Sequence, residues 1–200
     1  IKLLFLLTYK RLKKMAYKDG IVNSVIFSKT TPKILWILKE VNHNGDLENW
    51  NFTKILQDLK TDCGIEKGFE RTFAPIVHLS YGIINKKTWS EVPYHYDEPD
   101  IIDILKQIAY INVKKTAGGS TIHFSSLEKA YDENKVDLFI QINEINPDII
   151  IYGGTYYLFE NDNDIMLKNQ NIKHISAYHP SQRSITHENY YNKVYEQVYG

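Results

Sequence analysis

The chain has 200 residues, enough for one domain of ordinary size that buries most of the surface its unfolded form exposes. Its 24 basic and 24 acidic side chains balance, so overall charge neither indicates nor excludes a nucleic-acid partner, and any basic surface must be local. Cys63 is the only cysteine, which excludes an intrachain disulfide, a thiolate zinc site and a cysteine-ligated iron–sulfur cluster within this chain.

The apolar stretch near the amino terminus is too short to cross a membrane. Leu3–Leu7 falls far below the roughly 18 apolar residues that a spanning helix needs, and no signal-peptide cleavage pattern follows it. We therefore expect a soluble, cytoplasmic protein with no membrane partner, and we expect it to be a monomer.

The first part of the chain predicts an outer helix, a buried strand and a second helix. A loose helical period covers residues 4–17, and the apolar run Lys33–Leu38 has the length and composition of a strand buried on both faces. An amphipathic helix ending near Gly64 is then predicted by apolar residues at helical spacing, which are Phe52, Ile55, Leu56 and Leu59.

Residues 65–96 give the weakest pattern in the sequence. They are rich in aromatic side chains and show no sustained period. We expect them to form an insertion or loop region with a short strand at Ile76–Leu79.

The remaining sequence alternates helices and strands. Helix starts are indicated by Asp97-Glu98-Pro99 and by a capping box at Ser125–Glu128. The expected elements, in chain order, are a helix from Asp97, a strand at Ile108–Ile111, a helix from Ser125 to about Ile145, a strand at Asp148–Tyr152, a short helix at Thr155–Glu160, a polar loop at Asn161–Asp164, a strand at His174–Tyr178 and a closing helix over Tyr191–Val198.

This alternation predicts an α/β fold, specifically a three-layer α/β/α sandwich with a mainly parallel four-stranded central sheet. We expect a single domain over residues 1–200, with a helical extension at 1–32 and an insertion at 65–96.

Each expected strand ends in a small polar cluster. The clusters contain Glu40, Asn112, the pair Gly153-Gly154, and His179. Because the carboxyl ends of parallel strands meet at one edge of the sheet, where open α/β sheets bind ligands, we expect these residues to surround one cleft. No phosphate loop, dinucleotide-binding glycine pattern or G-x-S-x-G elbow is present, so ATP- and NAD-dependent functions are disfavoured.

In order and spacing, these strand-end motifs resemble the uracil-DNA glycosylase superfamily from about Lys33 to the carboxyl terminus. The motifs that carry the resemblance are Lys39-Glu40-Val41-Asn42, Ala-Tyr-Ile-Asn112-Val, Asn-Pro147-Asp148 through Gly153-Gly154, and His179-Pro180-Ser181. The second and last motifs match the family well. The first departs from it, because Lys39 replaces a small Gly and Asn42 replaces a Pro. The absence of a cysteine cluster would place the chain among the cluster-free branches.

The resemblance implies a DNA-repair enzyme, without metal or cofactor, that hydrolyses the N-glycosidic bond of uracil or a related damaged base in single- or double-stranded DNA. Such enzymes extrude the nucleotide into a pocket and cleave through an oxocarbenium-like state. Glu40 would orient water and stabilise the sugar cation, and His179 would hydrogen-bond the leaving base. Asn112 would read the edge of the base, and Phe52 would stack on it. The expected DNA contacts are Ser181, Gln182, Arg183, Lys114 and Lys115.

Two other functions remain open from the sequence. A non-catalytic nucleic-acid or nucleobase-binding protein of the same fold would suit the altered first motif, in which Lys39 could pair with Glu40 and quench it. An unrelated nucleoside hydrolase would also bring Glu40 and His179 together. Structural roles compete at single positions as well, because Phe52 suits a helix core, and Lys114-Lys115 or Arg183 suit ordinary surface charge.

Overall fold

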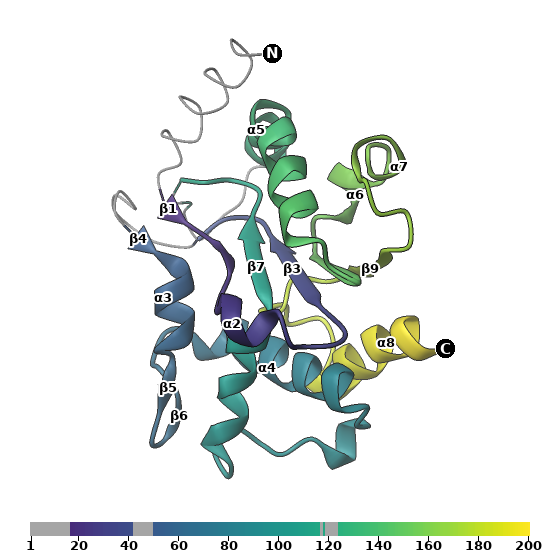
Figure 1. Cartoon of the computed structure of the whole chain (residues 1–200). Helices are drawn as coiled ribbons and strands as arrows, with labels where there is room; N and C mark the ends of the chain where they lie inside the picture. Colours follow the sequence, from purple (N-terminus) through teal and green to yellow (C-terminus); the bar gives the residue numbers. More distant parts are fainter. Residues whose placement is uncertain (1–16, 42–49, 117, 119–123) are drawn as a thin grey trace.

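The computed structural model describes residues 17–41, 50–116, 118 and 124–200. Its central sheet contains five strands, which follow one another in space as β2 (Gly20–Ile21), β7 (Ala109–Asn112), β3 (Ile34–Leu38), β8 (Ile149–Gly153) and β9 (Lys173–Ala177). β7, β3, β8 and β9 run parallel, and β2 is antiparallel to β7 at one edge (Figure 1). The α/β class and the mostly parallel sheet are confirmed. The expected number of four strands is wrong, because two-residue β2 is too short to leave a sequence pattern.

Helices and short strand pairs complete the described fold. The helices are α2 (Ser24–Phe27), α3 (Phe52–Gln57), α4 (Glu70–Asn85), α5 (Phe124–Ile145), α6 (Tyr156–Phe159), α7 (Asn163–Met166), α8 (His187–Tyr199) and the 3-10 helices η1 (Trp89–Glu91) and η2 (Pro99–Gln107). The two minor pairs are β1 (Tyr17–Lys18) with β4 (Trp50–Asn51), and β5 (Lys60–Thr61) with β6 (Gly64–Ile65). Among the described residues, no helix combines the length and apolarity needed to span a membrane.

Apolar side chains cover both faces of the sheet. Along β3, Trp36 and Leu38 join a core cluster with α3, α4, η2 and α8, whereas Leu35 and Ile37 join a second cluster with α5, α6 and α7. Figure 1 shows the green helices α5 to α7 on one side of the sheet, and α4 with α8 on the other. Because successive strand residues point to opposite faces, one continuous apolar run supplies both clusters.

The expectation of a strand at Ile76–Leu79 is wrong, because these residues lie inside α4. Every residue from Phe73 to Ser80 is buried, and the Trp36 indole of β3 donates a hydrogen bond of 3.0 Å to the Ser80 hydroxyl. A short buried run of this kind cannot be told from a buried strand by its sequence pattern alone. Pro75 lies early in α4, where its missing N–H removes only one helical bond.

Other boundaries differ by smaller amounts. The second predicted helix, α3, ends at Gln57 rather than near Gly64, which instead lies in β6. Helix α5 begins at Phe124, so Ser125 lies in its first turn rather than at its N-cap. The polar loop predicted at Asn161–Asp164 contains the start of α7. Of the extension predicted at 1–32, residues 17–32 contribute β2 to the sheet, and the helix predicted over 4–17 lies outside the described residues apart from its last position.

Candidate functional site

The carboxyl ends of the parallel strands lie at one edge of the sheet. In the register of the sheet, Leu38 is opposite Asn112, and Gly153 is opposite Ala177. Pairing continues beyond the strands, since the Lys114 amide donates to the Lys39 carbonyl at 2.9 Å. The structure therefore brings the segments that carry Glu40, Asn112, Gly153-Gly154 and His179 to the same edge, which we call the carboxyl edge.

His179 is held in one tautomer by its own loop. The Ser181 amide donates to His179 Nδ1 at 3.2 Å, and the Ser181 hydroxyl lies 2.9 Å from the same nitrogen. A nitrogen that accepts a backbone N–H carries no proton, so the ring proton of the neutral imidazole is on Nε2. No described residue accepts a hydrogen bond from Nε2, which leaves this donor available to a ligand.

The surroundings keep His179 neutral. Burial, followed by the positive charges of Lys39 and Arg71, lowers the pKa of His179 to about 4. Arg71, at the start of α4, also donates to the Ser181 carbonyl at 3.1 Å, which ties α4 to the His179 loop. At neutral pH the carboxyl edge therefore presents a neutral imidazole donor near the positive charges of Lys39 and Arg71.

The two glycines after β8 allow the chain segments of this edge to pack closely. A Cβ on Gly153 would lie 2.1 Å from Leu38 Cδ2, and Gly154 has a φ of +76° that favours glycine. A Cβ on Gly154 would also lie 3.1 Å from Lys39 Cε and 3.5 Å from the His179 amide nitrogen. The pair thus lets the Lys39 side chain lie against the backbone beside His179.

Glu40 is paired, but not with the lysine that the sequence suggested. Its Oε2 lies 2.6 Å from Lys114 Nζ, and only 7% of its side chain is exposed. Gly118 closes over the carboxylate, because a Cβ at this position would lie 1.9 Å from the Glu40 carboxyl carbon. Lys39 forms no ion pair with Glu40 in the described structure, although the negative charge of Glu40 partly opposes the lowering of the Lys39 pKa by burial.

Asn112 is fully buried, and only some of its polar groups have hydrogen-bond partners. Its backbone N–H donates to Asp19 at 2.9 Å, and its side-chain oxygen accepts from the Tyr110 hydroxyl at 3.3 Å. Within the part of the chain that the structure describes, its side-chain nitrogen has no hydrogen-bond partner. A buried amide N–H without a partner costs on the order of 1–3 kcal/mol, so this group is suited to a ligand oxygen if the site opens to admit one.

Phe52 is a core residue, which departs from the expected stacking on a base. It is 2% exposed, and its ring stacks on Tyr110 with centroids 5.2 Å apart. Phe73 lies against the same two rings. Tyr110 therefore occupies a face of Phe52 and the oxygen of Asn112, both of which a bound base would need.

Lys115 does not contribute to an exposed basic surface, contrary to expectation. Its ammonium lies 2.7 Å from Asp19 Oδ2, with 7% and 1% of the two side chains exposed. Gln141 of α5 completes this buried cluster by accepting from Lys115 at 3.2 Å. Adjacent residues on an extended chain point to opposite faces, which is why Lys114 reaches Glu40 while Lys115 reaches Asp19.

The remaining predicted DNA contacts lie in the loop after His179. Ser181 is engaged with His179, as described above, and Gln182 folds back on its own loop, accepting from the Ile185 amide at 2.9 Å. Gln182 is thus a loop-stabilising residue in this structure rather than an extended wedge. Arg183 is exposed.

Three residues that the sequence did not single out take part in this arrangement: Arg71, Asp19 and Gly118. Arg71 and Asp19 are far in sequence from the residues they contact, so no local pattern could have revealed them. Gly118 belongs to no motif that the sequence pattern identifies.

Comparison with known proteins finds no family model, no curated protein and no solved structure that matches this chain. Within the described residues, no three histidine, cysteine or acidic side chains come together in a group able to hold a metal ion. The functional conclusion therefore rests on the residues themselves.

Proposed function

We propose that the chain is a DNA glycosylase-like enzyme of the uracil-DNA glycosylase type, built as a three-layer α/β/α sandwich, that hydrolyses the N-glycosidic bond of uracil or a related damaged base. The observation that carries the proposal is the neutral His179 imidazole, whose Nε2–H is free to donate at the carboxyl edge beside Lys39 and Arg71. Two cations beside a neutral donor suit a phosphate-bearing ligand.

The proposed chemistry divides bond cleavage between two sides of the sugar. As the C1′–N bond breaks, its electron pair moves to the base, and the negative charge that develops on the base oxygen accepts the Nε2–H of His179. Water adds to C1′ on the other side, and its proton passes to the Glu40 carboxylate, which also stabilises the sugar cation. The unpaired N–H of Asn112 would donate to a carbonyl oxygen of the base.

A second candidate function is supported by specific contacts. Lys114 neutralises Glu40, and Tyr110 stacks on Phe52, so the same site could bind a nucleobase or nucleic acid without cleaving it. This candidate differs from the first only in catalysis, which makes an activity assay decisive.

The test is incubation of the protein with single- and double-stranded oligonucleotides that contain one uracil, followed by alkaline cleavage. Strand breaks confined to the uracil position support the proposal, and an undamaged oligonucleotide of the same sequence is the control. If neither form is cleaved but both are retained in a filter-binding assay, the binding function replaces the enzymatic one. Release of a base from free nucleosides alone would instead support a small-molecule hydrolase.

A further inference from the structure

Lys39 is a partly buried amine at the carboxyl edge. Its side chain lies against Gly154, and its Nζ is 5.4 Å from the centroid of the Phe124 ring at the start of α5. Among the described residues, no side chain forms an ion pair or hydrogen bond with this amine. Glu40 is next to it in the chain, and the charge of Lys39 also reaches His179.

These surroundings make the neutral, nucleophilic form of the amine easier to reach than it is for an exposed lysine. Burial lowers the pKa of Lys39 below its ordinary value, and the opposing influence of Glu40 is smaller. Glu40 is already neutralised by Lys114 at 2.6 Å, which reduces its hold on a second cation. Lysines in partly desolvated sites are the ones that form Schiff bases with carbonyl carbons.

We propose that Lys39 is a nucleophile toward the sugar aldehyde of an abasic site, so that the carboxyl edge cleaves the DNA strand by β-elimination in addition to removing the base. This inference rests on the proposed function for its substrate. It adds a strand-cleaving activity that hydrolysis of the N-glycosidic bond alone does not provide.

The steps balance without any further reactant. The Nζ lone pair attacks C1′ of the ring-opened sugar, and the aldehyde oxygen leaves as water to give an imine. The C2′ proton passes to the Glu40 carboxylate, the C2′–H electron pair forms a C2′=C3′ bond, and the C3′–O bond breaks with the 3′ phosphate as leaving group. Water then hydrolyses the imine, which releases the unsaturated aldehyde and regenerates the amine.

The test uses an oligonucleotide with a preformed abasic site, so that it does not depend on base excision by the protein. Wild-type protein is incubated with it in the presence of borohydride, which reduces an imine to a stable covalent adduct. We expect an adduct on a denaturing gel. Because trypsin does not cleave after a modified lysine, the DNA remnant should be found on the uncleaved peptide of residues 34–54, at Lys39.

Matched variants complete the experiment. Lys39→Arg keeps the charge and Lys39→Gln removes it, and either should lower the adduct yield at least about tenfold. Lys33→Arg is the control, because Lys33 precedes the first residue of β3 whereas Lys39 follows the last, and it should leave the yield unchanged. Absence of the adduct, or its location on another amine, would overturn the inference.

The two proposals fail separately. Uracil excision without an adduct on abasic DNA leaves the proposed function standing and overturns the role of Lys39. An adduct at Lys39 without uracil excision supports the lysine and contradicts the proposed function.

Discussion

The Ser181 amide donates a hydrogen bond to His179 Nδ1 at 3.2 Å, and this backbone contact determines which ring nitrogen carries the proton. The catalytic part assigned to His179 follows from that tautomer, because only Nε2–H can then donate to a leaving base. Because the bond comes from the Ser181 backbone, replacing the Ser181 side chain should affect the tautomer much less than replacing His179 affects catalysis.

His179→Ala should lower the single-turnover rate of base excision by on the order of 10² to 10³, because the lost donor strengthens only as charge builds on the base. Ser181→Ala keeps the backbone N–H that fixes the tautomer, so its rate should stay within about tenfold of wild type. DNA binding, measured by fluorescence anisotropy, should be nearly unchanged for both. Equal losses in the two variants would contradict the backbone assignment.

Lys115 and Arg183 should give opposite results when their charges are removed. Lys115→Met leaves Asp19 buried without its ion-pair partner and should lower the free energy of unfolding by about 2–4 kcal/mol in urea titrations, with little effect on the salt dependence of DNA binding. Arg183→Gln removes an exposed charge, so stability should hold while the slope of log affinity against log salt falls by about 1. The reverse pattern would place the phosphate contact at Lys115.

The parallel strands were predictable because their runs are short, apolar and rich in β-branched residues, and their common carboxyl edge followed from parallel pairing. Helix α4 was not, because a short buried run inside a helix has the same sequence pattern as a buried strand. The two-residue strand β2 could not be predicted either, because only its pairing with β7 identifies it as a strand.

The position of the candidate site was predictable from the sequence, but the hydrogen bonds and ion pairs within it were not. The strand-end residues Glu40, Asn112 and His179 could be read from the sequence, whereas their partners could not. Glu40 pairs with Lys114, and Asn112 is held by Asp19, a residue 93 positions away. Phe52 fits either a base platform or a core position by sequence, and only the neighbouring Tyr110 ring decides between them.

Gly118→Ala should displace the Glu40 carboxylate, because the new Cβ would lie 1.9 Å from the carboxyl carbon of a side chain that is nearly buried. We expect a loss of about 1–3 kcal/mol in stability and a fall in excision rate, because the carboxylate would move away from the sugar cation that it stabilises. Gly68→Ala is a suitable control, since its φ of +95° brings backbone strain but no atom lies within 4 Å of the new Cβ. An active Gly118→Ala enzyme would argue against a role for the position of Glu40.

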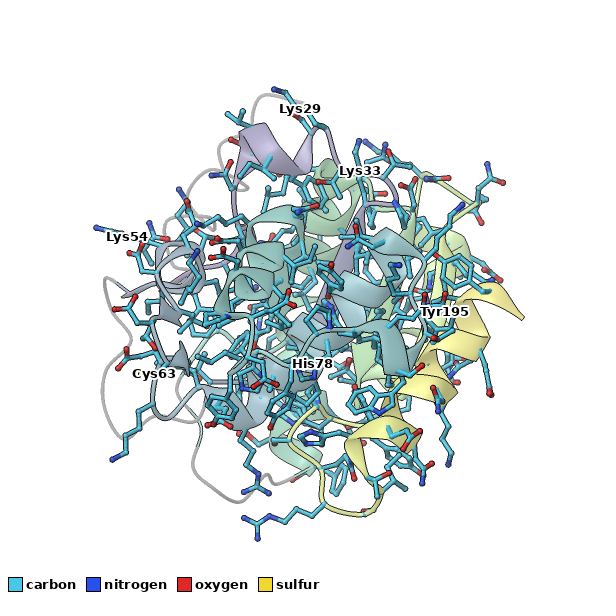
Figure 2. The ribbon with its side chains drawn as sticks, turned by 90° about the horizontal axis from the view of Figure 1, so that it is seen from below. Lys29, Lys33, Lys54, Cys63, His78 and Tyr195 are labelled. Atoms are coloured by element: carbon cyan, nitrogen blue, oxygen red, sulfur yellow. The ribbon has the colours of Figure 1, made fainter. Side chains whose placement is uncertain are left out.

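A buried histidine pair at α4 should make the protein less stable in mild acid. His78 of α4 and His95 lie 3.1 Å apart, nitrogen to nitrogen, and each also has a buried ring nitrogen for which no described residue is a hydrogen-bond partner. The charged or titratable groups that face them are Glu70, whose carboxylate is 3.8 Å from His95, and His187 at the start of α8. Figure 2 shows His78 beside the yellow carboxyl-terminal segment that leads into α8.

Burial, together with the nearby charges of His95 and His187, lowers the pKa of His78 to about 4 in the folded protein. In the unfolded chain the pKa of a histidine is about 6.5, so between these pH values the unfolded state binds more protons. Stability should therefore be unaffected by His78 above about pH 6.5 and should fall as the pH drops toward 4, by on the order of 3 kcal/mol from this residue. Urea titrations at several pH values measure this fall, and His78→Leu should reduce it while leaving the contribution of His179. A pH dependence identical in wild type and His78→Leu would show that His78 titrates normally in the fold.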